Sequence, residues 1–246
     1  IIPMFIIPFF LIIIMVTQMI VLEINEEKSS KSMEIIITSV PARLHFISKI
    51  ITANVYAILQ SLLFVLYFGV GLLIRRLVTG SSLISGLDSQ VGNVVNQFIQ
   101  SGTLDNLLKC LPVTIIMILL SFVAYSLIAG ILASMTTNQE DFQQLQSPMM
   151  MIIMAGYFLA ILASTYEKST FITTVSVIPF ISCILSPVLL MMGQIGIVHV
   201  LISILLLILT LYLLIKYGLR VYKVGILNYS SSNLWKKILE GIKSKE

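Results

Sequence analysis

Charged residues are scarce in this chain, and their scarcity excludes a water-soluble fold. Asp, Glu, Lys and Arg make up 11% of the 246 residues, and 58% of the residues are hydrophobic. Soluble domains contain about 25% charged residues, and the mean hydropathy here is +1.04. Because about 20 apolar residues cross a bilayer once, this composition predicts an all-α, polytopic membrane protein.

Cysteine is rare, and motifs for catalysis are missing. Cys110 and Cys183 show neither CxxC nor metal-ligand spacing, so two buried thiols are a better interpretation than a disulfide. The chain has no nucleophile elbow, no paired intramembrane aspartates, no HExxH and no Walker lysine loop. We therefore expect no catalysis and no bound cofactor or metal, and no motif indicates nucleic-acid binding.

The middle of every apolar segment lacks Asp, Glu, Lys and Arg. Intramembrane ionisable residues usually mark proton relays and cation paths, and no internal repeat is detectable, so both absences argue against a secondary transporter. His199 stands alone, without an expected partner. Uncharged polar groups in such segments more often join helices than bind ligands; this expectation covers Thr17, Gln18, Asn54, Gln60, Ser121, Ser126, His199, Ser203 and Thr210.

Five apolar segments are long enough to span a bilayer. A sixth, residues 171–193, contains Pro179 and Pro187, and each proline removes a helical hydrogen bond. We interpret it as a re-entrant hairpin, which survives at membrane depth only when protein or water covers it. Residues 77–109 are mixed in composition and predict a surface loop with short amphipathic helices. The predicted spans are residues 1–22, 50–74, 111–134, 148–166 and 195–216.

The positive-inside rule orients these spans. If residues 23–49 are cytoplasmic, eleven of the fifteen Lys and Arg lie on that side, and Arg75, Arg76, Lys109 and Lys168 lie opposite. This predicts a transmembrane domain over residues 1–222, an extracellular hairpin and a cytoplasmic basic tail over residues 223–246. A start at Ile1, without a signal-peptide pattern, predicts a truncation that removes an N-terminal part.

Two segments on the predicted cytoplasmic side stand out. Residues 26–41 (EEKSSKSMEIIITSVP) pass from acidic to amphipathic, with Met33, Ile36 and Ile37 able to share one face before Pro41 ends the helix. The pattern suits either a helix resting on lipid headgroups or a lever that docks a partner. Residues 136–148 read as a polar loop, with Pro148 in the first turn of the next span.

These segments resemble motifs of the type-2 ABC exporter permeases. Residues 26–41 are similar to the stretch after the second span of that family, and residues 138–148 (NQEDFQQLQSP) to its next cytoplasmic loop. The IPF of residues 178–180 with Ser186 and Pro187 resembles its extracellular hairpin, and residues 220–227 (RVYKVGIL) its motif after the last span. The NatB-like sodium-efflux permeases are the most similar subgroup, and in that subgroup one more span and a large extracellular domain come first.

The resemblance implies a fold, a function and partners. The chain would be a helical bundle of the type-2 ABC exporter kind, working as two permease copies with two cytoplasmic ATPase subunits that carry ATP and Mg. It would reside in a bacterial plasma membrane and export sodium ions, a peptide, an antibiotic or a lipid. The implied coupling helix comprises Lys31, Ser32, Met33, Glu34, Ile36, Ile37 and Thr38; the second cytoplasmic loop comprises Glu140, Asp141, Gln143 and Gln144; the hairpin contains Pro179 and Pro187.

A second hypothesis remains open at this stage. A membrane scaffold or sensor that does not transport, and whose cytoplasmic helix recruits a partner, would share every gross feature of the sequence. Nucleotide-dependent efflux in proteoliposomes, driven by a partner ATPase, distinguishes the two.

Overall fold

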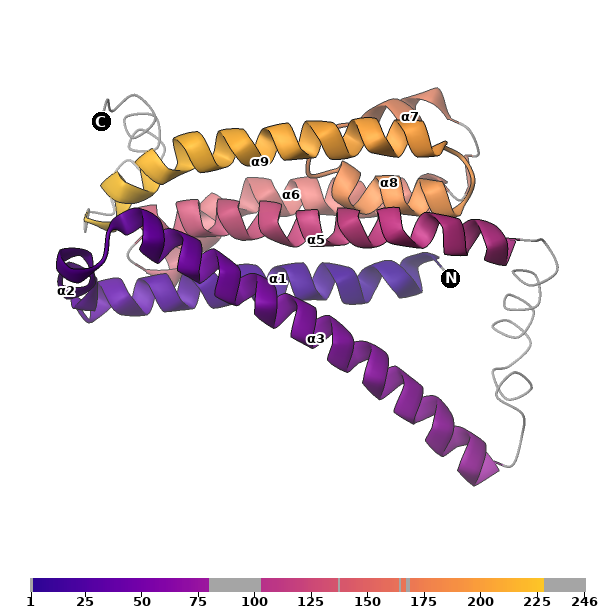
Figure 1. Ribbon diagram of the computed structural model, residues 1–246, viewed down its shortest axis with the longest axis horizontal. Coiled ribbons are helices and arrows are strands. Elements are labelled where there is room, and N and C mark those ends of the chain that lie inside the picture. Colours follow the sequence, from indigo (N-terminus) through magenta and orange to yellow (C-terminus); the bar gives the residue numbers. More distant parts are fainter. Residues whose placement is uncertain (1, 80–102, 137, 164, 167–168, 228–246) are drawn as a thin grey trace.

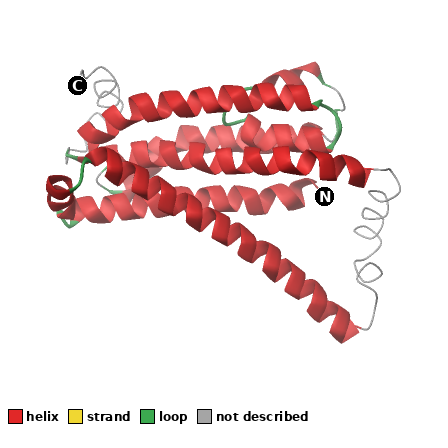
Figure 2. Ribbon diagram, in the orientation of Figure 1, coloured by secondary structure: helices red, strands yellow, loops and turns green. Residues whose placement is uncertain are grey.

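The computed structural model is helical over the part of the chain that it describes, residues 2–79, 103–136, 138–163, 165–166 and 169–227 (Figure 1). Within these residues only helices and connecting loops occur (Figure 2). Five helices are long and apolar enough to cross a membrane, which confirms the predicted polytopic helical fold. The elements are α1 (Ile2–Ser29), α2 (Ser32–Ser39), α3 (Ala42–Thr79), α5 (Thr103–Met135), α6 (Gln139–Ala163), α7 (Thr170–Val175), α8 (Ser182–Met191) and α9 (Ile197–Ile226).

Helix α5 forms the centre of the bundle. It contacts α1, α3, α6, α8 and α9, and 61% of its most apolar stretch is buried inside the protein. Helices α1, α5, α6 and α9 run side by side, with α2 at one end and α7 and α8 toward the other (Figure 1). We refer to these as the α2 end and the α8 end.

Helix α3 packs on the bundle over its first part and diverges from it over its second part. It has 38 residues, which corresponds to about 57 Å at 1.5 Å per residue. Ala53 and Ala57 are fully buried, and between them Asn54 Nδ2 donates to Ser126 Oγ on α5 at 2.9 Å. Beyond Ala57 no described side chain of α3 is buried, and the helix diverges from its neighbours (Figure 1). Lipid tails are as apolar as leucine, so a bilayer accommodates this exposed surface.

The apolar segment after α6 is broken into α7 and α8. The break contains Pro179 and Phe180, and Phe180 has a positive φ of 71°. Tyr125 Oη on α5 donates to the Phe180 carbonyl at 3.0 Å, which holds the turn against the bundle. Only one of the two prolines lies at the break, because Pro187 is inside α8. That this pair of helices is extracellular remains a prediction.

Some polar side chains inside the spans join helices, whereas the hydroxyls of Thr17, Ser121 and Thr210 donate to carbonyls of their own helices. Gln18 Nε2 on α1 donates to Gln146 Oε1 on α6 at 3.0 Å. The expectation that His199 has no partner is wrong: its Nε2 lies 2.9 Å from the Thr173 carbonyl and 3.1 Å from Ser176 Oγ. These contacts connect α9 with α7. The sequence could not reveal them, because Ser176 becomes a neighbour of His199 only when α7 folds back beside α9.

The placement of Pro148 in the first turn of a span is also wrong. Helix α6 begins at Gln139, so most of the predicted polar loop is helical and Pro148 lies in the helix interior. The Asn138 carbonyl accepts the Phe142 N–H at 3.3 Å. Glu140 and Asp141 occupy the first turn, where negative charge favours a helix N-terminus.

Two predicted features fall largely outside the described residues. The surface loop predicted over residues 77–109 contains residues 80–102, which are not described, whereas α3 extends to Thr79 and α5 begins at Thr103. The basic tail from residue 228 onward is likewise outside the described part, and α9 continues to Ile226.

Candidate functional site

A tight turn at the α2 end sets α2 between two spans. Ser30 closes the last turn of α1, because the Glu26 carbonyl accepts its N–H at 3.0 Å and its Oγ at 2.8 Å. Lys31 then adopts the left-handed conformation, with φ 57°, and the chain turns into α2. At the other end Val40 is extended, with φ −132°, because a residue before proline avoids the helical region and Pro41 follows.

Helix α2 has one face packed on the protein and one face exposed. Met33 is fully buried, and Ile36 and Ile37 are half-buried, so the predicted apolar face is the one turned inward. Ile35, which the sequence analysis did not single out, is 72% exposed. This face therefore offers a large apolar side chain for docking, bordered by exposed Lys31, Glu34 and Thr38.

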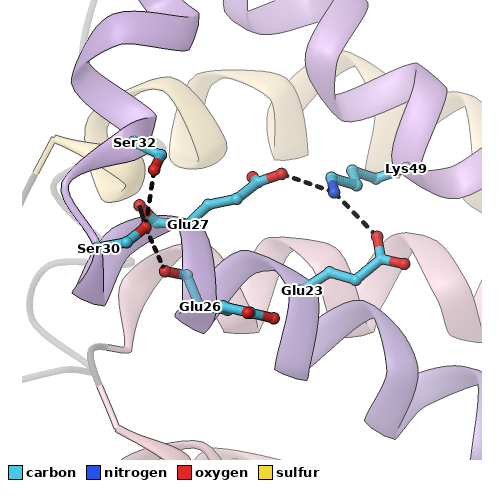
Figure 3. Close-up of a pocket in the computed structure, with 6 residues that line it drawn as sticks. All are labelled: Glu23, Glu26, Glu27, Ser30, Ser32 and Lys49. Atoms are coloured by element: carbon cyan, nitrogen blue, oxygen red, sulfur yellow. Dashed lines mark hydrogen bonds and ion pairs between the residues drawn. The ribbon is translucent and has the colours of Figure 1, made fainter.

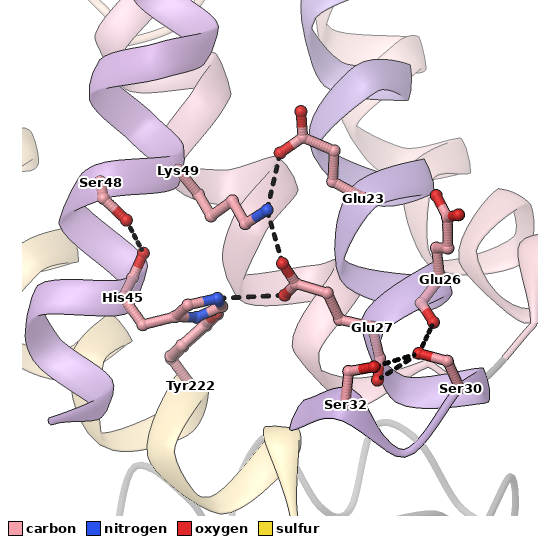
Figure 4. Close-up of polar contacts among 9 residues, drawn as sticks. All are labelled: Glu23, Glu26, Glu27, Ser30, Ser32, His45, Ser48, Lys49 and Tyr222. Carbon is pink, nitrogen blue, oxygen red and sulfur yellow. Dashed lines mark hydrogen bonds and ion pairs between the residues drawn. The ribbon is translucent and has the colours of Figure 1, made fainter. Parts of the chain in front are cut away.

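An ionic cluster, formed by Glu23, Glu27, His45 and Lys49, lies beside α2 and joins α1 to α3 (Figure 4). Lys49 Nζ is 2.7 Å from Glu27 Oε1 and 2.9 Å from Glu23 Oε2. His45 Nε2 is 3.0 Å from Glu27 Oε2. Glu27 and Lys49 are 20% and 18% exposed, so water screens this pair less than it screens a surface ion pair.

The spacing of the cluster residues was the signal that the sequence analysis missed. Glu23 and Glu27 are four residues apart on α1, and His45 and Lys49 are four residues apart on α3. Residues at this spacing lie on one face of a helix. The two acidic residues precede α2 in the sequence and the two basic residues follow it. Once both flanking segments are known to be helical, this arrangement indicates a row of ion pairs between them.

The same cluster reaches α9 through aromatic side chains. His45 Nδ1 lies 2.8 Å from Tyr222 Oη, and the rings of Phe46 and Tyr222 have centroids 4.5 Å apart. All three residues are buried. Three spanning helices therefore meet at the α2 end through direct side-chain contacts.

A crevice of about 260 Å³ opens between α1, α2 and α3 beside the cluster. Its walls carry carboxylates, hydroxyls and one ammonium group (Figure 3). Across the described residues, no group of three or more His, Cys, Asp or Glu could hold a metal ion. The lining residues are Glu23, Glu26, Glu27, Ser30, Ser32 and Lys49.

The second predicted loop lies in the first turns of α6. Glu140, Gln143 and Gln144 are exposed and Asp141 is half-buried. The turn before α6 lies against α1, where Thr136 Oγ1 donates to Asn25 Oδ1 at 3.3 Å. The two predicted segments thus share the α2 end, although the contacts described here join the second one to α1 rather than to α2.

A Tyr222→Phe variant tests the link between α3 and α9. Removing the hydroxyl leaves His45 Nδ1 without its contact on α9 and is expected to lower the free energy of unfolding by about 1 kcal/mol. The measurement is unfolding of the purified protein in detergent. Tyr212→Phe, at a residue that is 59% exposed on the same helix, is the control and should unfold like the wild type. Equal effects of the two substitutions would contradict the described contact.

Five spanning helices, with a short helix set between the first two, define a multi-pass membrane protein. The chain belongs to the ABC-2 family of transporter proteins, whose profile matches residues 1–217. The family is described as one of transporter proteins, which agrees with the multi-pass helical fold of this chain.

A curated relative is also similar to the chain. It is the uncharacterized protein YhaP of Bacillus subtilis (strain 168), which is 30% identical over 231 residues. The match covers 94% of this chain but 52% of the relative, so the chain spans about half the length of that protein. No solved structure matches the chain.

Proposed function

We propose that the chain is the permease subunit of an ATP-driven exporter, and that α2 couples it to a separate ATPase subunit. The observation that carries this proposal is the placement of α2 across the end of the bundle. One face of α2 is anchored by Met33, and the other face exposes Ile35 between Lys31 and Glu34. An exposed apolar side chain bordered by charges is suited to docking in a cleft of a soluble partner.

The ionic cluster supports the second half of this proposal. A docking helix transmits a push only if it is connected rigidly to the spans. Helix α2 follows α1 directly and precedes α3 directly, and Glu27 and Lys49 join these two helices beside it. A displacement of α2 would therefore reach both helices.

The remaining parts of the proposed machine follow from the family resemblance. Two copies of the permease would assemble with two ATPase subunits, which would hold ATP and Mg, in a bacterial plasma membrane. Helices α7 and α8 would form the extracellular hairpin. The substrate would be sodium ions, as in the NatB-like subgroup, or a peptide, an antibiotic or a lipid.

Charge reversal on the exposed face of α2 tests the docking site. Lys31→Glu combined with Glu34→Lys preserves the net charge but inverts its pattern, and we expect it to weaken the association with the ATPase about tenfold, which corresponds to about 1.4 kcal/mol. The assay is co-purification of the ATPase with the full-length permease, together with substrate-stimulated ATP hydrolysis in proteoliposomes.

The control for this experiment is Lys216→Glu, which reverses an exposed charge on α9 outside the proposed docking face. Normal co-purification and normal stimulated hydrolysis by the double variant would show that α2 is not the docking site. A wild-type protein that recruits a partner but shows no nucleotide-dependent efflux would instead support the scaffold or sensor hypothesis.

A further inference from the structure

Lys28 is a buried cation in the last turn of α1. Its side chain is only 1% exposed, and it lies four residues before the start of α2. Burying an ammonium group is costly unless it is paired or hydrogen-bonded. An apolar side chain of similar length would fill the same space without that cost, so the charge itself has a role in this position.

The Lys28 ammonium group connects the ends of two other helices. Its Nζ donates to the Ser134 carbonyl at 2.8 Å and to the Gly225 carbonyl at 3.1 Å. Ser134 and Gly225 are each the last residue but one of their helices, α5 and α9. Carbonyl groups at a helix C-terminus lack partners within the helix and carry the negative end of the helix dipole. They are therefore suitable acceptors for a buried cation.

The two helices that Lys28 contacts are packed closely against each other. A Cβ atom added at Gly225 would lie 2.6 Å from Met135 Sδ and 2.8 Å from the Ser134 carbonyl oxygen. Gly218, two turns earlier on α9, lies directly against the side chain of Ile131 on α5. Such close approach leaves little room for α5 and α9 to slide past each other at this end.

Helix α1, which leads into α2 through a tight turn, thus has two distinct connections to the rest of the bundle. The ionic cluster joins α1 to α3, and His45 extends it to Tyr222 on α9. Lys28 joins the last turn of α1 to the paired ends of α5 and α9. Directional hydrogen bonds to two backbone carbonyls fix the position of α1 more tightly than apolar packing alone does.

We propose that Lys28 is the positioning residue that makes α5 and α9 follow a displacement of α2. The proposal rests on the proposed function, because it needs an ATPase that moves α2. In this mechanism the ammonium group stays bound to both helix ends while α2 moves. Helices α1, α5 and α9 would then shift together at the α2 end, whereas α3 would follow through the ionic cluster.

The test compares Lys28→Met with wild type, using the full-length permease and its ATPase in proteoliposomes. Methionine is unbranched and of similar length but cannot donate a hydrogen bond. We expect Lys28→Met to retain co-purification of the ATPase and basal ATP hydrolysis within twofold, and to lose nucleotide-driven efflux at least tenfold. Lys28→Arg, which keeps the charge and the donors, should recover part of the efflux. Lys216→Met on the exposed surface of α9 is the matched control and should transport like the wild type.

A distance measurement provides a second readout, and its wild-type arm does not depend on the folding of the variant. The two native cysteines are first substituted. Two exposed residues, Ser39 on α2 and Val224 on α9, are then replaced by spin-labelled cysteines. In otherwise wild-type protein, the distance between the labels should stay constant when a non-hydrolysable ATP analogue and Mg are added. In Lys28→Met it should change, because α2 moves without α9.

The outcomes separate this inference from the proposed function. Wild-type efflux by Lys28→Met would overturn the role of Lys28 while leaving the exporter proposal intact. If Lys28→Met does not assemble, the label distance in the wild type decides. A change of several ångström on nucleotide binding would overturn the role of Lys28, and a constant distance would support it. If the wild type neither recruits an ATPase nor shows nucleotide-dependent efflux, the proposed function fails, and this inference fails with it.

Discussion

Replacing Glu27 by leucine is expected to lower the free energy of unfolding by about 2–3 kcal/mol. Glu27 is the carboxylate that both basic groups of the ionic cluster share: Lys49 Nζ lies 2.7 Å away and His45 Nε2 lies 3.0 Å away. Without it, Lys49 remains largely shielded from water and keeps only Glu23 as a counter-charge. The measurement is denaturant unfolding of the full-length protein in detergent micelles.

The matched control is Glu26→Leu. Glu26 is the preceding residue on α1, and its side chain is exposed, so the same chemical change there should alter the free energy of unfolding by less than about 0.5 kcal/mol. If Glu27→Leu were as stable as Glu26→Leu, the cluster would contribute nothing to stability. The rigid connection that we propose between α2 and the spans would then lose its main physical support.

A Gly225→Val substitution is expected to cost about 2–3 kcal/mol through overpacking between α5 and α9. The space that a side chain would need is already occupied by Met135 and by both the hydroxyl and the carbonyl of Ser134, all within 2.8 Å of the added Cβ. Backbone atoms are among these neighbours, so a flexible side chain cannot simply move aside. The helix ends must separate, and the carbonyl groups that Lys28 bridges separate with them.

Gly69→Val serves as the control for this prediction. Gly69 lies on the exposed part of α3, and nothing lies within 4 Å of the position of its added Cβ. Thermal unfolding of the two variants in the same detergent should therefore separate overpacking from the loss of glycine itself. Equal stabilities would contradict the close approach of α5 and α9 at Gly225.

The two substitutions test different contacts between the helices at the α2 end of the bundle. Glu27→Leu removes the link from α1 to α3, whereas Gly225→Val distorts the ends of α5 and α9 without changing a charge. An exporter that tolerates one but not the other would show which helices carry the displacement of α2. Both measurements should be made together with ATPase co-purification, so that weakened coupling is not mistaken for weakened docking.

Near-neighbour patterns made part of the site predictable. The inward face of α2 follows from the spacing of Met33, Ile36 and Ile37, and the end of α2 follows from Pro41, because both depend on residues a few positions apart. The start of α6 could not be placed in the same way. The four glutamines of residues 136–148 read as a loop, but α6 begins at Gln139, has acidic residues in its first turn and continues through the other three.

The role of Lys28 was not predictable, although the residue is visible in the sequence within a charged stretch. Its neighbours Glu26, Glu27 and Lys31 suggest a segment fully exposed to water, and a lysine there would normally be solvated. Its burial depends on the ends of α5 and α9, and Gly225 is 197 residues away along the chain. A local pattern contains no information about such an acceptor.

The length and composition of the apolar segments were enough to predict a membrane protein with five spanning helices, and the pattern of residues 26–41 was enough to predict a short amphipathic segment after the first span. These properties depend on the length of the apolar segments, on the absence of charged residues in the middle of each segment and on the residues that end each helix. The folded structure was needed to establish that Glu27 contacts both His45 and Lys49, that α3 diverges from the bundle beyond Ala57 and that Lys28 bridges two helix ends. An ion pair or a buried cation needs a partner at about 3 Å. The spacing of Glu23 and Glu27 and of His45 and Lys49 indicates which side chains can pair, but only helix packing fixes their distances. The acceptors of Lys28 lie on helices that are far away along the chain.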